Sequence, residues 1–500
     1  MSSPADLRAF VAELEERGLL VRIARPVSVV HEITEIHRRV IAAGGAALLF
    51  EQPVGADGAV AAMPVLVNLF GTRERVALGL GVEPTGLARL GEKLARLRYP
   101  EPPANLRGTI RQVPLLRAAL ALGSKTIAKP PVQQQRWTGA EVDLGRLPIQ
   151  WCWPGEPAPL ITWPLVITRA PDDPTDVNVG IYRMQVVGKD RLIVRWLANR
   201  GGARHHRLWA RQGLDMPIAV AIGTDPFTML SAVMPLPDGM SELDFAGVLR
   251  GARTRVARGV SVDLPVPADA EIVLEGRVAC AETADEGPYG DHTGYFNAVE
   301  PFPVVTLSAM TMRRDPLYLS TFTGRPPDEP AVLGDALADL FLPLVRRQFP
   351  EIVDLWLPPD ACSYRAMVVS IDKRYAGQSR RLMMGLWSTL PQFSYVKLIV
   401  VVDPDIDVRN WSDVIWAIST RFDASRDLLV LTDTPIDYLD FASPKAGLGG
   451  KLGLDATNKI GTETGREWGR VLRMTPEVMA RVDGLWSELG LEPLASGSPQ

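Results

Sequence analysis

A chain of 500 residues, 46% hydrophobic and 22% charged, is long enough for roughly two or three domains, each with its own core. Its formal net charge of −4 excludes nucleic acid as the main partner, because phosphate binding requires a basic surface. Its three cysteines are widely separated and form no CxxC pair, which favours a reducing cytoplasm. The first residues lack a signal-peptide pattern, and no apolar run approaches the ~20 residues of a membrane span.

Helical and strand-like patterns alternate over the first part of the chain. Ser3 and Pro4 predict the start of a helix that Gly18 ends, and a strand is predicted at 19–23. A second helix is predicted around 32–43, where a glycine pair stops it. This alternation predicts an N-terminal α/β domain over residues 1–125.

The middle of the chain has a different sequence pattern. Short β-rich runs separated by Gly, Pro and Asp turns predict a mostly antiparallel split barrel over residues 126–328, interrupted by one helix at 241–250. The alternation returns in residues 329–500, and the run 397–403 is apolar on both faces, as in a covered parallel sheet. A loop over 435–470 and a terminal helix near 476–490 follow. Such a detached helix often packs on a neighbouring subunit, so a homo-oligomer is predicted.

Two carboxylates lie five residues apart in the segment Glu286-Gly-Pro-Tyr-Gly-Asp291-His-Thr-Gly-Tyr295. Its Gly and Pro residues exclude regular helix and central strand, because proline lacks a backbone donor and glycine permits positive φ. Two acids held close on such a loop can take different pKa values, one kept ionised and one able to carry a proton. A polar surface turn would explain the segment if it stood alone, but other polar segments accompany it.

Arginines occur in two of these accompanying segments. Arg183, in a strand-like run that begins at Asn178, suggests a guanidinium aimed at an anion, although a surface salt bridge is the simpler explanation for this residue alone. The run Arg195-Trp-Leu-Ala-Asn-Arg200-Gly-Gly resembles an edge that holds a phosphate, because its glycines let the backbone approach a ligand.

Candidate metal ligands occur in the same region. Glu242 follows the helix-capping Ser241, which is a sufficient structural reason for it; the functional alternative is an oxygen ligand for a hard divalent cation, with Asn178. His205 belongs to a histidine pair that could ligate a metal, but most such pairs are simply solvated. No Walker pattern, GxSxG elbow or HExxH motif occurs, which argues against a standard nucleotide fold, a serine hydrolase and a zincin; a flavin phosphate remains open.

At this point the chain resembles, nearly end to end, the UbiD family of decarboxylases. Asp291, where other branches carry glutamate, and the long C-terminal match make it most similar to the branch that acts in ubiquinone biosynthesis. Besides the loop 286–295, the runs that carry the resemblance are Glu32-Ile-Thr-Glu-Ile36, Asn68-Leu-Phe-Gly-Thr72, Pro159-Leu-Ile-Thr-Trp163, Gly324-Arg-Pro-Pro-Asp-Glu-Pro330, Thr434-Pro-Ile-Asp-Tyr-Leu-Asp-Phe-Ala-Ser-Pro444 and Gly453-Leu-Asp-Ala-Thr-Asn-Lys459.

The resemblance implies prenylated FMN, a divalent metal (typically Mn²⁺) and K⁺ as cofactors. It implies a catalytic network of Arg183, Glu286 and Asp291, in which Asp291 is the proton donor. Asn178 and Glu242 would hold the metal, and His205 falls where some distant branches place a metal-ligating histidine. The flavin contacts that it implies are Ile181, Tyr182, Arg183, Arg195, Trp196, Leu197, Arg200, Gly201, Met234, Pro235 and Lys451.

The function expected from this resemblance is non-oxidative decarboxylation of 4-hydroxy-3-polyprenylbenzoate to 2-polyprenylphenol. A separate flavin prenyltransferase would supply the cofactor to a cytoplasmic dimer or hexamer, with contact to the inner face of the cell membrane left open. The alternatives are the same chemistry on a small aromatic or heteroaromatic acid, a metal-dependent hydrolase built on Glu242, Asn178 and His205, and a non-catalytic scaffold. A wide apolar channel beside Glu286 would favour the polyprenyl substrate, and a closed pocket the small acid.

Overall fold

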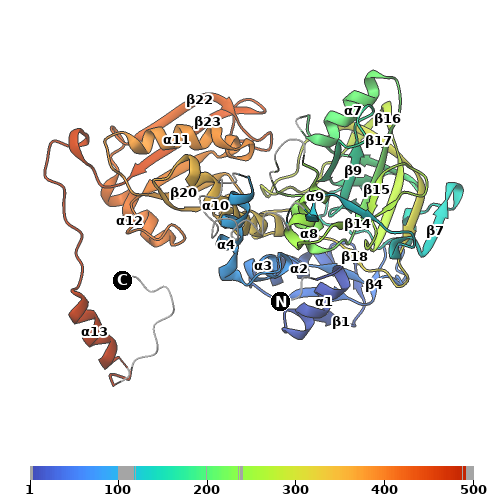
Figure 1. Cartoon of the computed structure of the whole chain (residues 1–500), viewed down its shortest axis with the longest axis horizontal. Helices are drawn as coiled ribbons and strands as arrows, with labels where there is room; N and C mark the ends of the chain where they lie inside the picture. The colour runs from blue at the N-terminus through green and yellow to red at the C-terminus, as the bar shows by residue number, and fades with distance from the viewer. Residues whose placement is uncertain are drawn as a thin grey trace.

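The computed structural model describes residues 4–98, 118, 120–198, 200–234, 236, 240–486 and 488–490. The chain forms a mixed α/β structure around a curled antiparallel sheet, which confirms the predicted fold class. The N-terminal elements lie against this central region, and the C-terminal elements form a second lobe beside it (Figure 1). Among the described residues, no helix is both long and apolar enough to cross a membrane.

The N-terminal sheet has the strand order β1-β3-β5-β18. Its last strand comes from far along the chain and pairs in parallel with β5, which ties the end of the central region to the N-terminal part. Helix α1 begins at Leu7, later than predicted, because Asp6 rather than Ser3 caps it by accepting a bond from the Ala9 amide at 2.9 Å. The elements are α1 (Leu7–Glu16), β1 (Leu20–Ile23), β2 (Val27–Ser28), α2 (Glu32–Ala42), β3 (Ala47–Phe50), β4 (Pro53–Val54), β5 (Val65–Val67), α3 (Arg73–Gly79), α4 (Leu87–Arg98) and β18 (Tyr318–Leu319).

The central sheet has nine strands, in the order β10-β9-β13-β16-β17-β12-β11-β8 with β7 paired to β17, and its pairings are antiparallel. Its longest strands, β16 and β17, are neighbours, and the loop that joins them carries Asp291. The strands of this sheet are β7 (Gln135–Thr138), β8 (Leu160–Ile161), β9 (Leu165–Arg169), β10 (Val177–Ile181), β11 (Met184–Val186), β12 (Arg191–Val194), β13 (Met216–Ile222), β16 (Ile272–Glu286) and β17 (Glu300–Met312). A separate three-stranded sheet, in the order β15-β14-β6, consists of β6 (Ser124–Thr126), β14 (Thr254–Arg258) and β15 (Pro265–Pro267).

The central region also holds more helices than predicted. The predicted helix is α9 (Glu242–Arg250), but α7 (Gly201–Arg211) and α8 (Pro226–Ser231) accompany it. Helix α7 escapes a search for apolar periodicity because the side of it that packs inward consists of Gly202, Ala203 and His205.

The C-terminal lobe is built on the sheet β19-β20-β21-β23-β22, in which β21 pairs in parallel with both β20 and β23. The predicted loop over 435–470 is wrong in part, because it contains strand β23. Helix α4 crosses α10 closely: a Cβ on Gly91 would lie 2.4 Å from the Leu340 carbonyl oxygen. The elements are α10 (Glu329–Gln348), β19 (Ile352–Trp356), β20 (Ala366–Ile371), α11 (Gln378–Thr389), β21 (Leu398–Val402), α12 (Trp411–Arg421), β22 (Leu428–Pro435), β23 (Leu448–Ala456) and α13 (Pro476–Leu485).

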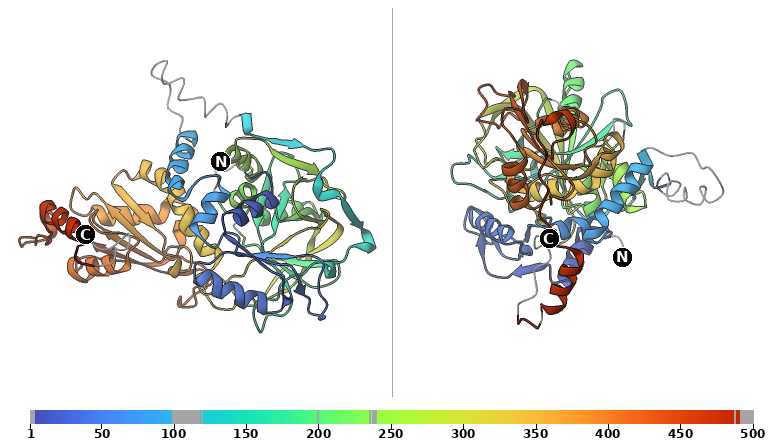
Figure 2. Two further views of the ribbon diagram at one scale, coloured as in Figure 1. Left: turned by 90° about the horizontal axis from the view of Figure 1, so that it is seen from below. Right: turned by 90° about the vertical axis from the view of Figure 1, so that its left-hand side faces the viewer.

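The tail after β23 leaves the lobe. Figures 1 and 2 show α13 apart from the other elements, and none of its residues is buried. Apolar side chains on the tail are exposed, among them Leu472 at 97% and Met474 at 71%.

Candidate active site

Arg183 is the centre of the candidate site. It stands between β10 and β11 and donates to Glu286 through Nε at 2.8 Å and Nη2 at 3.2 Å. Its Nη1 donates to Asp291 Oδ2 at 2.8 Å, and Nη2 also donates to Asn297 Oδ1 at 2.7 Å. The structure therefore brings the three predicted catalytic residues together. It adds Asn297, which the sequence did not single out and which only its place on the same loop could have suggested.

Glu286 ends β16 and is fully buried. It also accepts from Arg195 Nη1 at 2.7 Å, so two guanidinium groups face one carboxylate. A buried charged group is tolerated only when it is paired and hydrogen-bonded, and both guanidinium groups supply such bonds to Glu286. Arg195 also reaches the partly exposed Glu300, because its Nη2 donates to Glu300 Oε2 at 2.7 Å.

Asp291 has both carboxylate oxygens occupied. Oδ2 accepts from Arg183, and Oδ1 accepts from the backbone amide of His292 at 2.8 Å and lies 2.9 Å from its Nδ1. Burial alone would raise the pKa of Asp291, but the bond from His292 and the charge of Arg183 outweigh it and hold this pKa below its ordinary value. Asp291 is therefore a carboxylate in this arrangement.

The loop that carries the acids needs its glycines. Gly287 has a φ of +93°, which side chains rarely adopt, and its amide donates to Gln185 Oε1 at 2.9 Å. Gly290 lies against the indole of Trp153, where an added Cβ would be 2.3 Å from Cδ1. The indole in turn donates to the Thr323 carbonyl at 2.9 Å, so the loop is pressed against a fixed ring.

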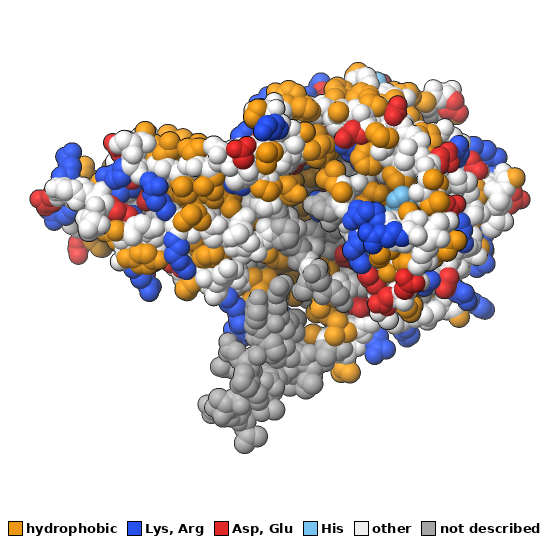
Figure 3. Space-filling model, turned by 90° about the horizontal axis from the view of Figure 1, so that it is seen from above, with side chains coloured by type: hydrophobic (Ala, Val, Ile, Leu, Met, Phe, Trp, Pro, Cys, Tyr) orange, Lys and Arg blue, Asp and Glu red, His pale blue; other side chains and the backbone are white. Residues whose placement is uncertain are grey.

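A cleft of about 640 Å³ lies between the central region and the C-terminal lobe. Several predicted flavin contacts line it from the central side: Trp196, Leu197 and Arg200. Lys and Arg side chains gather on the central lobe where the two lobes meet (Figure 3). The Arg195 guanidinium lies over the rings of Phe302 and Tyr438, at 4.7 and 5.2 Å from their centroids, and both rings line the cleft. The acid network is thus attached to the wall of the cleft.

The glycines at the start of α7 let its backbone lie close to neighbouring side chains. A Cβ on Gly201 would lie 2.0 Å from Asn178 Oδ1, and the Gly202 amide donates to the Tyr182 hydroxyl at 3.3 Å. Arg200 stands at the N-cap without a side-chain capping bond, so its side chain leaves the positive end of the helix dipole without a cap. These groups fit a phosphate, as the predicted flavin contact at Gly201 requires.

The other predicted flavin contacts are distributed around this point. Ile181 and Tyr182 directly precede Arg183, and Tyr182 meets Trp196 edge-on with 5.9 Å between ring centroids. Met234 is buried after α8, and Pro235 lies outside the described residues. Lys451, on β23, is buried, and its Nζ donates to the carbonyls of Ser394, Val396 and Pro435 at 2.5, 3.1 and 3.1 Å; desolvation lowers its pKa to about 8.

Glu242 lies beside β10, the strand that carries Asn178. Glu242 Oε2 accepts from the amide of Val179, the residue after Asn178, at 2.8 Å. Burial raises the pKa of Glu242 to about 7, and no cationic side chain within the described residues pairs with it. A carboxylate desolvated in this way, next to a carboxamide, fits a divalent cation bound through oxygen.

His205 has other partners. Its Nδ1 lies 2.9 Å from Thr168 Oγ1 and its Nε2 lies 3.2 Å from Asp176 Oδ1, and the side chain is fully buried. Both ring nitrogens therefore have protein contacts, and we leave His205 out of the metal site that we propose. The described part of the chain contains no group of three or more His, Cys, Asp or Glu residues arranged to hold a metal.

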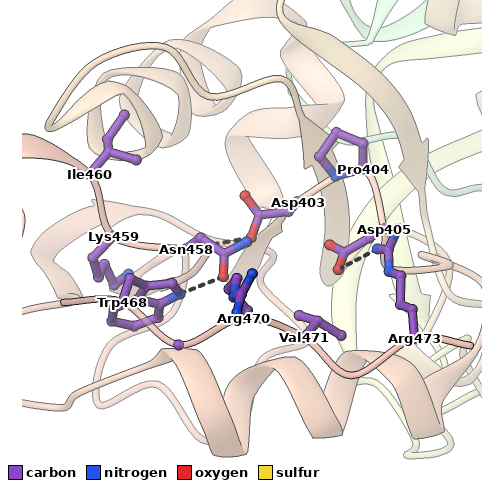
Figure 4. A pocket seen from close by; sticks show the side chains of 11 residues that line it. Asp403, Pro404, Asp405, Asn458, Lys459, Ile460, Trp468, Arg470, Val471 and Arg473 are labelled. Atoms are coloured by element: carbon purple, nitrogen blue, oxygen red, sulfur yellow. Dashed lines mark hydrogen bonds and ion pairs between the residues drawn. The ribbon is translucent and has the colours of Figure 1, made fainter.

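A second cavity, of about 680 Å³, lies at the carboxyl ends of β21 and β23, under the first part of the tail (Figure 4). Its acids are neutralised: Arg421 donates to Asp403 at 2.6 Å and to Asp405 at 2.8 Å, and Arg473 contacts Asp405 at 3.3 Å. None of the predicted site residues lines it, so we assign it no chemistry.

The chain combines a curled antiparallel sheet, between two α/β parts, with a buried arginine–carboxylate network. Three family models match the chain: the 3-octaprenyl-4-hydroxybenzoate carboxy-lyase N-terminal domain over residues 11–94, the Rift-related domain over 125–326 and the C-terminal domain over 331–456. The chain therefore belongs to the UbiD family.

Solved structures agree with this membership. The UbiD-class enzyme HmfF from Pelotomaculum thermopropionicum, determined in complex with FMN, is 29% identical, with a TM-score of 0.79 over 95% of this chain and 98% of that one. Vanillic acid decarboxylase from Sedimentibacter hydroxybenzoicus, in its closed form, is 24% identical, with a TM-score of 0.81 over 97% and 98%. The 3,4-dihydroxybenzoic acid decarboxylase AroY from Klebsiella pneumoniae is 21% identical, with a TM-score of 0.76 over 95% and 99%; the last two show the fold alone.

Proposed function

We propose that this protein decarboxylates 4-hydroxy-3-polyprenylbenzoate to 2-polyprenylphenol, using prenylated FMN, a divalent metal such as Mn²⁺, and K⁺. The observation that supports decarboxylation most directly is the Arg183 network, in which one guanidinium holds two carboxylates at the edge of a cleft large enough for a flavin. The bound flavin would supply the electron sink for the charge that CO₂ leaves on the ring. Family membership and the FMN complex of HmfF support the cofactor.

The side chains of this protein would then position the substrate and the flavin and protonate the ring carbon. Arg183 holds Glu286 and Asp291 at fixed places, and the second guanidinium, Arg195, donates a further hydrogen bond to Glu286. Asp291 would deliver a proton to the carbon that CO₂ has left, which requires that it be protonated at that step. Tyr182, Trp196 and the start of α7 would hold the flavin and its phosphate.

An exposed apolar surface favours the polyprenyl substrate over a small acid. Tyr295 and Phe441 are 65% and 56% exposed and meet edge-on with 5.9 Å between ring centroids. Tyr295 follows Asp291 on the same loop, and Phe441 follows Tyr438, which lines the cleft. An apolar chain that leaves the cleft beside Asp291 would therefore meet these two rings, whereas a small acid would need neither of them.

The test of this function is mass spectrometry of quinone precursors in cells that lack the gene. We expect 3-polyprenyl-4-hydroxybenzoate to accumulate, and the wild-type gene but not Glu286→Gln to reverse the accumulation. Normal ubiquinone and unchanged precursors, in cells without a second decarboxylase, would refute the substrate. Screening small aromatic acids with the loaded enzyme would then follow.

The double substitution Tyr295→Ser, Phe441→Ser is expected to weaken the binding of long-chain substrates selectively. Each ring loses apolar contact worth about 1 kcal/mol or more, so KM for a long-chain substrate should rise roughly tenfold or more. KM for unprenylated 4-hydroxybenzoate, measured in the same preparation, should not change. An equal change for both substrates would contradict a tail surface at these residues.

Substituting Glu242→Gln is expected to abolish the stabilisation of the apoprotein by Mn²⁺. Glutamine can still accept the bond from the Val179 amide but supplies no charge, so the fold survives while the cation loses its anionic ligand. The measurement is the Mn²⁺-dependent shift in Tm of the two proteins. Glu477→Gln, a first-turn acid of the exposed helix α13, serves as the control and should keep the full shift.

Self-association would use the tail. We propose that α13 packs on a second copy of this chain, because none of its residues is buried and its side chains Met479, Val482 and Leu485 are exposed in the described part of the protomer. Truncation after Thr464 is expected to reduce the oligomer seen by sedimentation to a smaller species. A truncated protein that keeps the same number of subunits would contradict this role.

A separate flavin prenyltransferase would supply the cofactor. Contact with a membrane that holds the substrate would occur at the exposed pair of rings, Tyr295 and Phe441.

A further inference from the structure

His292 lies between two carboxylates that belong to different parts of the fold. Its Nδ1 is 2.9 Å from Asp291 Oδ1, on the acid loop, and its Nε2 is 3.4 Å from Asp437 Oδ2, in the C-terminal lobe. The side chain is 16% exposed, and its ring faces that of Tyr364 at 6.1 Å. A continuous line of polar groups thus leads from the wall of the cleft, where Asp437 lies, to Asp291.

The two carboxylates decide the charge of this imidazole. Burial alone would lower the pKa of His292, but its hydrogen bond to Asp291 and its ion pair with Asp437 raise this pKa to about 9. The other charged or titratable groups around it are Arg183 on the far oxygen of Asp291, Arg365 at 3.5 Å from Asp437, Tyr364, which donates to Asp437 at 3.2 Å, and the buried Asp328. His292 therefore carries a proton at neutral pH.

Asp291, in contrast, is deprotonated. Two cationic groups, Arg183 and His292, hold it as a carboxylate, so it carries no proton when it would be needed as an acid. The nearest stored proton is the one on His292 Nδ1, already directed at Asp291 Oδ1. A transfer between these two atoms needs no movement of heavy atoms through the site.

We propose that His292 stores and relays the proton that Asp291 delivers, and that Asp437 of the C-terminal lobe keeps that store filled. The proposal rests on the proposed decarboxylation. In each turnover the Nδ1–H proton of the imidazolium passes to Asp291 Oδ1, and Asp291 passes a proton to the carbon from which CO₂ has left. The neutral imidazole then takes one proton from water. One proton is consumed for each CO₂ released, and no electron is transferred to or from these residues. His292 is a positioning residue, because it acts through Asp291.

The sign of the pH effect follows from this assignment. The active form has His292 protonated, so kcat should fall as pH rises through the pKa of His292. Removing the charge of Asp437 removes a group that favours the imidazolium, so Asp437→Asn should move this fall to lower pH by about one unit. Asp440→Asn is the control, since Asp440 lies in the same loop and pairs with Lys397 at 2.9 Å and with Arg365 at 3.6 Å, whereas His292 pairs with Asp437.

The experiment combines kinetics with a direct titration of the side chain. The holoenzyme is prepared with ¹³C-labelled histidine; the chain has five histidines, so His292→Asn identifies the resonance of His292. We expect His292 to titrate well above an ordinary histidine in the wild type and about one unit lower in Asp437→Asn, with the fall in kcat moving by the same amount. Asp440→Asn should leave both where they are. His292→Asn should lower kcat and abolish the fall near pH 9.

Two results would overturn the relay. One is a fall in kcat that stays in place while the titration of His292 moves, and the other is an ordinary titration of His292 in the wild type. The titration does not depend on turnover, so it separates this inference from the proposed function. Absence of wild-type turnover would refute the substrate assignment, while a His292 titration that shifts with Asp437 would still support the stored proton.

Discussion

Replacing Arg183 with lysine is expected to lower kcat by about 10³-fold while the protein remains folded and retains flavin. Arg183 donates four hydrogen bonds to three acceptors, Glu286, Asp291 and Asn297. Lysine keeps the charge but has one nitrogen in place of a planar fork, so it cannot hold both carboxylates in their present positions. Steady-state kinetics of the loaded enzyme, with the flavin content measured by absorbance, checks this result.

Arg421→Lys is the matched control for this substitution. The Arg421 side chain is 3% exposed, against 14% for Arg183, and it also bridges two acids, Asp403 and Asp405, which line the second cavity. The control should lose stability, measured as Tm, and keep its kcat. Equal losses of activity in both variants would mean that the effect is general destabilisation, and full activity in Arg183→Lys would remove the network from the mechanism.

The acid loop was the part of the site most open to prediction from sequence. Glycine permits positive φ and proline lacks a backbone donor, so Gly287 and its neighbours predict a shaped loop, and the structure gives Gly287 a φ of +93°. The alternation of helices and strands at both ends of the chain can also be predicted, because buried strands and amphipathic helices leave periodic apolar patterns in the sequence. The resemblance to a family supplied the residue roles that no pattern could.

The elements that escaped prediction owe their form to contacts made across the fold. Strand β23 contains three glycines before Leu454 and resembles a turn locally, yet β21 and β22 pair with it on both sides. His205 was considered as a metal ligand because adjacent histidines suggest one; its partners Thr168 and Asp176 lie on β9 and just before β10, and no local pattern predicts them. The contact between His292 and Asp437 likewise joins residues of separate lobes.

Substituting Gly202→Ala is expected to raise the dissociation constant for FMN roughly tenfold or more. A Cβ at this position would lie 2.9 Å from Trp196 Cε3 and 3.0 Å from Tyr182 Cε2. Both rings are buried and already meet each other edge-on, so neither can move away without disturbing the other. Overpacking of this kind typically costs about 1–3 kcal/mol. We expect this cost to appear as weaker binding of the flavin, because the two displaced rings would contact it. Quenching of FMN fluorescence on titration with apoprotein measures the change.

The control for this prediction is Gly465→Ala, a glycine without positive φ and with no atom within 4 Å of an added Cβ. It should bind FMN as the wild type does. Because FMN binding is measured without substrate, the result bears on the cofactor site alone and is independent of which aromatic acid is decarboxylated. Unchanged affinity in Gly202→Ala would place the flavin away from Tyr182 and Trp196. A selective loss would locate the flavin ring beside Tyr182 and Trp196, which directly precede and follow in sequence the arginines that hold Glu286, Arg183 and Arg195.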